Sequence, residues 1–232
     1  MQNHDPQAIF DQKHAAGYDQ RWAKLAPLRD ALHLFIGAVL SDLKADARVL
    51  CVGVGTGSEL IYLTQRFPRW HFTAVEPSTA MLDVCRRKAE ECGVSDRCVF
   101  HAGYLDSLPP SDTFDAATSL LVSQFVLDRQ ARVGFFRAIA NRLHPRAFLI
   151  NADLTADTSS AEYQSLLEVW LRIMKSADFT PEDLDRLRTA YSRDVAVLPA
   201  NEVRAILTAG GFGDPVQFLQ TGLIHAWYTR RA

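Results

Sequence analysis

The 232-residue chain has little of what marks an exported, membrane-spanning or metal-binding protein. Its cysteines, Cys51, Cys85, Cys92 and Cys98, have neither CxxC spacing nor a matching histidine pair. This argues against a zinc site or a disulfide framework and favours reduced thiols in a cytoplasm. The polar N-terminus predicts no signal peptide, and the longest apolar run near it, ALHLFIGAVL, is about half a membrane crossing. We expect a cytoplasmic protein without a metal.

The chain also lacks an excess of positive charge, since its formal net charge is −2. Proteins that bind nucleic acids usually carry a basic stripe that neutralises phosphates, so the charge disfavours such a partner. With 48% hydrophobic and 22% charged residues, the composition is that of a globular protein with a substantial core. These features favour a small-molecule substrate.

Segments typical of strands and helices alternate between residues 48 and 154. The apolar and β-branched runs predict strands at 49–55, 71–77, 97–103, 114–126 and 147–154, separated by predicted helices at 58–67, 78–93 and 129–144. Such alternation implies right-handed βαβ crossovers, and therefore a doubly wound α/β fold with a mostly parallel sheet.

The rhythm changes after residue 154. Helices are expected throughout 155–198 and again at 200–212, followed by two strands within 215–231; an amphipathic helix is expected near 30–43. We therefore expect a single domain with four parts: an N-terminal helical lid (1–45), a cofactor-binding core (46–154), a helical cap (155–200) and a C-terminal helix with strands (201–232).

The stretch VLCVGVGTGSEL (49–60) places Gly53, Gly55 and Gly57 between a predicted strand and a predicted helix. Bare backbone at this turn lets a ligand lie against the helix N-terminus. A tight turn alone would need only one glycine. The single-residue spacing differs from the G-x-G-x-x-G form of dinucleotide sites, which disfavours a nicotinamide oxidoreductase.

Glu76 lies at the end of the second predicted strand, 19 residues beyond Gly57. A carboxylate at this position can accept hydrogen bonds from both hydroxyls of a ribose. A lone glutamate is more often a solvated loop residue, but the preceding glycine turn favours the ribose role.

Five stretches resemble, in order and spacing, the successive motifs of class I S-adenosylmethionine-dependent methyltransferases: VLCVGVGTGSEL, FTAVEPSTAML, HAGYLDSLP, FDAATSLLVSQFVLD and ANRLHPRAFLINADL. The resemblance covers about residues 8–154 and implies a Rossmann-like seven-stranded sheet with an antiparallel last strand. It also implies that S-adenosylmethionine binds across the carboxyl ends of the first, second and fourth strands.

By position, the resemblance assigns four groups of contacts to that cofactor. These are the methionine part at Gly53, Gly55, Thr56 and Gly57, the ribose at Glu76, the adenine at Pro77, Ser78, Met81, Tyr104 and Leu105, and the sulfonium at Leu120 and Leu121. The chain departs from the pattern at two positions, because members commonly carry an acid at Cys51 and an Asp at Tyr104. The cofactor's amino group therefore loses one expected polar partner.

Candidate residues facing the methyl acceptor come from three regions. Tyr18 and Trp22 lie in the N-terminal segment GYDQRW, which either closes over the cofactor or packs on the sheet. Gln124 follows the fourth strand, and Asp153 either binds an acceptor hydroxyl or amine or caps the next helix. In the predicted cap, Tyr191 lies in an apolar stripe with Trp170 and Met174. This stripe forms either an aromatic lid over the acceptor or part of the hydrophobic core, which is the more common role of such a stripe.

The resulting function is transfer of a methyl group from S-adenosylmethionine to a small, partly apolar molecule. One alternative is an enzyme similar to carboxy-S-adenosylmethionine synthase, in which Arg188 or Arg193 would hold the added carboxylate. Another is a protein that binds the cofactor without catalysis. Exposed faces of the helical cap offer a surface for a homodimer.

Overall fold

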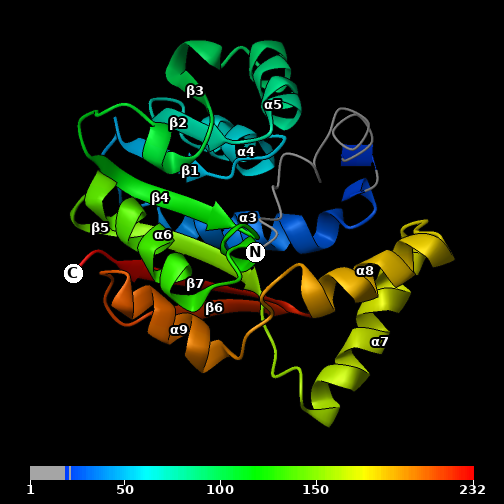
Figure 1. Ribbon diagram of the computed structural model, residues 1–232. Helices are drawn as coiled ribbons and strands as arrows, with labels where there is room; N and C mark the ends of the chain where they lie inside the picture. Colours follow the sequence, from blue (N-terminus) through cyan, green and yellow to red (C-terminus); the bar gives the residue numbers. More distant parts are fainter. Residues whose placement is uncertain (1–18, 21) are drawn as a thin grey trace.

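The computed structural model describes residues 19, 20 and 22–232, and its centre is a seven-stranded sheet (Figure 1). The strand order is β3-β2-β1-β4-β5-β7-β6. β1 to β5 are parallel, and β7 runs antiparallel to both of its neighbours. The strands are β1 (Arg48–Val52), β2 (His71–Glu76), β3 (Cys98–Ala102), β4 (Phe114–Leu120), β5 (Leu143–Leu154), β6 (Val216–Thr221) and β7 (Ile224–Arg230). The expected doubly wound, mostly parallel sheet is confirmed.

Helices cover both faces of this sheet (Figure 1). On one face lie α3 (Ala26–Val39), α4 (Ser58–Arg66) and α5 (Thr79–Glu91), and on the other lie α6 (Arg129–Arg142) and α9 (Ala200–Ala209). Each face has its own apolar core, built around Ile36 and Leu60 on the first and Phe136 and Ile206 on the second, all fully buried. Each such side chain stabilises the fold by roughly 1.5–3 kcal/mol.

Local sequence explains where several helices begin. Ser78, Asp128 and Ser160 accept hydrogen bonds from backbone N–H groups in the first turns of α5, α6 and α7 (Ala161–Ser176). Thr180 forms a capping box with Asp183 at the start of α8 (Pro181–Arg193). These side chains satisfy N–H groups that have no partner inside the helix, which explains why the four helices begin where they do.

Two boundaries differ from the expectation. The fourth strand ends at Leu120, and a short 3-10 helix, η3 (Ser123–Phe125), occupies the remainder of the predicted strand. β5 begins directly at Leu143, so Pro145 lies within a strand rather than after a helix. The pairing of β4 with β5 shifts register between Phe114 and Ala116, and this irregularity accommodates the proline.

Helices α7 and α8 form the helical cap, which lies beside the sheet end to which the β4 arrow points (Figure 1). The cap has its own apolar cluster, which includes Trp170 and Met174. Its two connections to the sheet are adjacent, because Thr155 and Leu198 form a parallel bridge and the Ala156 N–H donates to the Leu198 carbonyl at 3.0 Å. The chain thus leaves the sheet and returns at one place.

Candidate cofactor site

The order of the strands reverses at β1, whose neighbours are β2 on one side and β4 on the other. Ligands of open α/β sheets bind outside the carboxyl ends of the strands at such a switch point. The glycine turn between β1 and α4 and the ends of β2 and β4 meet there, so the predicted cofactor residues come from one edge of the sheet.

Gly55 is the glycine that leaves room for a ligand. Its φ of +54° is in the left-handed region, and a Cβ atom built there would meet only the Met81 methyl carbon, at 3.7 Å. A Cβ at Gly53 would instead collide with Val122, and one at Gly57 with the Cys85 sulfur, each at 2.4 Å. Two of the glycines are therefore required by packing inside the protein, and the third borders open space.

Glu76 is buried, with 7% of its surface exposed, and holds the glycine turn in place. Its Oε2 accepts a hydrogen bond from the Gly55 N–H at 2.9 Å, and its Oε1 accepts one from the Ser78 N–H, also at 2.9 Å. Burial raises the pKa of Glu76, while these two hydrogen bonds lower it. Each carboxylate oxygen retains a lone pair for a further donor.

Thr56 connects the glycine turn to the N-terminal segment. Its hydroxyl donates to Asp19 Oδ1 at 2.7 Å, and Asp19 Oδ2 pairs with the Lys88 ammonium at 2.5 Å. Thr56 itself is buried. The structure therefore places a side-chain contact at Thr56 that is separate from any ligand.

The end of β4 contains a strained residue. Leu121 has a φ of +59°, which is unusual for a residue with a side chain and costs on the order of 1–3 kcal/mol. Its N–H donates to the Ala152 carbonyl at 2.7 Å, which anchors the strained turn to β5. Leu120 and Leu121 are both only partly buried, so apolar surface faces outward where the sulfonium was predicted.

The residues predicted for the adenine lie around the start of α5 and the loop after β3. Ser78 caps α5, and its side chain and that of Met81 are buried. Pro77 is partly exposed. Tyr104 is 47% exposed and precedes the 3-10 helix η2 (Leu105–Ser107), in which Leu105 is buried. The residues predicted to contact adenine thus include one exposed aromatic residue and two buried apolar side chains.

Asp153 does not have either of the roles predicted for it. It is fully buried and forms an ion pair with Arg132 at 3.0 Å, and its oxygens accept from Ser123, Asn151 and the Gln124 N–H. A group enclosed in this way is a structural anchor between β5, α6 and η3. The next helix is capped by Ser160 instead.

Gln124 is also part of this structural network. Its Oε1 accepts from the Leu154 N–H at 2.7 Å, and its carbonyl accepts from the Ala196 N–H at 2.7 Å. The side chain is 5% exposed. It therefore joins the sheet to the segment that returns from the cap, and the prediction that it lines the acceptor site gains no support from its position.

The aromatic lid is wrong, and the alternative of a packed core is confirmed. Trp170 and Met174 are buried inside the cap, and the Trp170 indole N–H donates to the Tyr191 hydroxyl at 2.9 Å. Burial raises the pKa of Tyr191 to about 12. Trp22 packs edge-on against Phe179 of the cap, with ring centroids 5.8 Å apart, rather than on the sheet. Tyr18 lies outside the described residues.

The arginines proposed to hold a carboxylated cofactor are exposed and paired elsewhere. Arg188 forms an ion pair with Glu168 of α7 at 2.9 Å, and Arg193 forms one with its neighbour Asp194 at 2.8 Å. Neither ion pair involves a residue from the carboxyl edge of the sheet, so the synthase alternative gains no structural support.

Three charged residues of this region were missed or given no role from the sequence: Glu59, Lys88 and Arg132. Arg132 and Lys88 lie on helices in patterns typical of exposed faces, and their partners are distant in sequence. Glu59 resembled an ordinary acid in the first turn of a helix, yet it is 7% exposed. Burial, with the charge of Glu76, raises its pKa from 4.5 to about 7.

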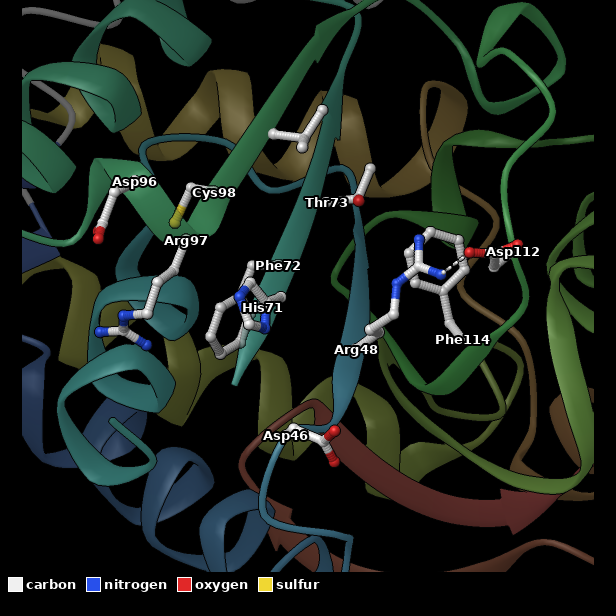
Figure 2. A pocket seen from close by; sticks show the side chains of 11 residues that line it. Asp46, Arg48, His71, Phe72, Thr73, Asp96, Arg97, Cys98, Asp112 and Phe114 are labelled. Atoms are coloured by element: carbon white, nitrogen blue, oxygen red, sulfur yellow. Dashed lines mark ion pairs between the residues drawn. The ribbon is translucent and has the colours of Figure 1, made fainter. Parts of the chain in front are cut away.

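A hollow of about 470 Å³ lies at the opposite edge of the sheet (Figure 2). It is lined by the first residues of strands, including Arg48, His71 and Phe114, and by Arg97. Arg48 is paired there with Asp112 at 3.1 Å. Because ligands of parallel sheets bind at the carboxyl ends, this hollow is on the wrong side for the glycine turn.

The described part of the chain contains no cluster of three or more His, Cys, Asp or Glu side chains that could hold a metal ion. No helix in it is long and apolar enough to cross a membrane.

Known sequences point to one domain type. Residues 49–146 match a family model described as a methyltransferase domain. The release factor glutamine methyltransferase of Rhodopirellula baltica is 31% identical over 102 residues, which cover 41% of this chain and 34% of that protein. The protein of the same name from Chlorobaculum tepidum is 33% identical over 118 residues, covering 51% and 38%. The matches thus span little more than a third of these relatives.

Solved structures share the fold at low sequence identity. The O-methyltransferase family 2 protein from Planctomyces limnophilus, in complex with apigenin, is 16% identical with a TM-score of 0.61, covering 92% of this chain and 61% of that one. The mitomycin 7-O-methyltransferase MmcR is 20% identical with a TM-score of 0.61, covering 84% and 52%.

The sheet order defines a Rossmann-like fold, and the glycine turn and the acid at the end of β2 meet at its switch point. Residues 49–146 are similar to a methyltransferase domain, and solved methyltransferases share the fold. S-adenosylmethionine is the cofactor that the resemblance of the motifs implies.

Proposed function

We propose that the protein binds S-adenosylmethionine across the ends of β1, β2 and β4 and transfers its methyl group to a nucleophile of a small, partly apolar molecule. The observation that carries this proposal is the open space at Gly55, held next to the carboxylate of Glu76 by a 2.9 Å hydrogen bond. Bare backbone beside a paired acceptor, at a switch point, fits an adenosyl ligand.

Each part of the site has a separate task in this proposal. The Glu76 carboxylate accepts hydrogen bonds from the ribose hydroxyls while it keeps its bonds to the Gly55 and Ser78 N–H groups. Met81 and Leu105 offer apolar surface to the adenine, and both are buried against the protein on their other sides. The geometry of the turn is thus fixed before the ligand binds.

When bound, S-adenosylmethionine supplies a methyl group on a positively charged sulfonium, so a good leaving group is already present. The residues of this chain have to position the acceptor and exclude water, which provides much of the rate enhancement in such reactions. The partly exposed side chains of Leu120 and Leu121 lie at the end of β4 and serve the second task. A general base is needed only for an acceptor that arrives protonated with a high pKa.

The small acceptor is supported by the charge of the chain and by its cap. A net charge of −2 offers no basic stripe for nucleic acid, and the two helices of the cap lie beside the end of the sheet to which the β4 arrow points (Figure 1). Two of the structural neighbours are a mitomycin 7-O-methyltransferase and an O-methyltransferase in complex with apigenin, and mitomycin and apigenin are small molecules. The curated relatives instead carry the name of a protein acceptor, but they share only the domain.

The proposal is tested by titration calorimetry with S-adenosylmethionine on the wild type and on Glu76→Ala, with Glu162→Ala as the control at an exposed acid. Loss of a buried acceptor should weaken binding about tenfold or more. Native mass spectrometry of protein purified without ligand should show the mass of S-adenosylmethionine or of its demethylated product. Equal affinity in all three proteins, or tighter binding of NADH, would contradict the assignment.

A further inference from the structure

The first strand of this methyltransferase domain ends without the acid that the motif predicts. Cys51 occupies that position, is fully buried, and has its pKa raised well above the usual value by burial. The residue is therefore a neutral thiol at every physiological pH. A positively charged ligand at this edge of the sheet receives no countercharge from β1.

Glu59 brings a carboxyl group to the same place from the following helix. It is the second residue of α4, and its side chain lies next to both Cys51 and Thr118. Cys51 and Thr118 are register partners on the neighbouring parallel strands β1 and β4, so their side chains project from the same face of the sheet. An acid is thus absent from the end of the strand but present in the first turn of the helix that follows.

Glu59 has polar neighbours, since its own backbone N–H and the Thr118 side chain lower its pKa, but no cation among the described residues is paired with it. In the described part of the chain no lysine, arginine or histidine lies within ion-pair distance of it. Glu76 adds a like charge, and Lys88, which lowers the pKa of Glu59, forms its own ion pair with Asp19. Acids that are almost fully buried are rare unless they are paired.

We infer that Glu59 binds the ammonium group of the methionine part of S-adenosylmethionine and so replaces the acid absent at residue 51. This inference rests on the proposed function and deepens it, because it assigns a residue to the part of the cofactor that distinguishes it from a simple nucleoside. Glu76 then serves the ribose and Glu59 the amino acid.

Binding of an ammonium group at Glu59 should change the protonation of its carboxyl group. Glu59 faces Cys51 of β1, Glu76 of β2, and Cys85 and Lys88 of α5, and only Lys88 among these favours its ionised form. With a pKa near 7 in the empty site, part of the population is protonated at neutral pH. An ammonium ion favours the carboxylate, so binding at pH 7 releases protons to the buffer.

The test compares two ligands by calorimetry at pH 7.5, S-adenosylmethionine and 5′-methylthioadenosine, which has the nucleoside but no ammonium group. Glu59→Gln should weaken binding of S-adenosylmethionine about tenfold or more and leave that of 5′-methylthioadenosine within about twofold, since only the first ligand loses a charged partner. Glu162→Gln, the same change at the exposed second position of α7, should alter neither.

A rescue variant separates a binding role from a structural one. Cys51→Asp in the Glu59→Gln background returns an acid to the end of β1 and should restore most of the lost affinity for S-adenosylmethionine. No loss in Glu59→Gln, or an equal loss for both ligands, would overturn the assignment of Glu59. Failure of the wild type to bind either ligand would instead overturn the proposed function.

Discussion

The buried carboxyl group of Glu59 should make the empty protein less stable as pH rises. Burial, the largest cause, and the nearby charge of Glu76 raise its pKa from 4.5 to about 7. A group that holds its proton more tightly in the folded state contributes stability that is complete below the unfolded pKa and is lost as pH climbs through the folded one. A rise of this size corresponds to roughly 3 kcal/mol of unfolding free energy.

Glu59→Gln removes that dependence, because a glutamine has no charge to bury. In urea unfolding at a series of pH values from 5 to 8, without ligand, the variant and the wild type should differ least near pH 5. By pH 8 the variant should be the more stable by up to about 3 kcal/mol, the full amount of the linkage. The titration of every other group contributes equally to both proteins, so it cancels when the unfolding free energy of the wild type is subtracted from that of the variant.

Glu162→Gln serves as the control, since that residue has the same helix position but an exposed side chain. Its unfolding free energy should follow the wild type within about 0.5 kcal/mol at each pH. If Glu59→Gln and the wild type gave parallel curves, the carboxyl group would titrate normally in the folded protein, and the argument from its burial would fail.

Gly55→Val should abolish measurable binding of S-adenosylmethionine by calorimetry, because its side chain enters the open space at the turn; Gly93→Val, at another left-handed glycine with nothing within 4 Å, should show a similar stability loss but normal binding. Normal affinity in Gly55→Val would contradict the position of the ligand. Arg132→Met should cost about 3–5 kcal/mol in urea unfolding by leaving Asp153 buried without its cation, whereas Arg129→Met, at an exposed pair, should cost about 1 kcal/mol or less. Equal losses would refute a buried ion pair.

The architecture could be predicted from the sequence because its signals are local. Alternating strand and helix patterns between residues 48 and 154 leave few topologies other than a doubly wound sheet, and capping side chains such as Ser78 mark where helices begin. Boundaries were less certain where a proline lies in a strand. The helix predicted at 129–144 ends at Arg142, and the register shift between β4 and β5 accommodates Pro145 inside β5.

Site residues could be predicted only where a sequence motif fixes both their position in the fold and the side to which they face. Gly55 and Glu76 lie at strand ends, so their meeting follows from the parallel sheet. Asp153 also lies at a strand end, but its pairing with Arg132 depends on how α6 packs across the sheet, which no local pattern contains. Periodicity likewise showed that Tyr191 faces one side of a helix and could not show that this side is the interior of the cap.

The two ends of the helical cap lie next to each other, so the cap and the sheet can have separate roles. Residues 156–197 depart from the sheet and rejoin it at the bridge between Thr155 and Leu198, so this length of chain can vary without altering the order or the register of the strands. On the proposed function, residues 156–197 would largely determine the specificity for the acceptor, and the sheet would determine the specificity for the cofactor. Specificity for a new acceptor could then arise by replacement of residues 156–197 alone, with the methyl donor unchanged.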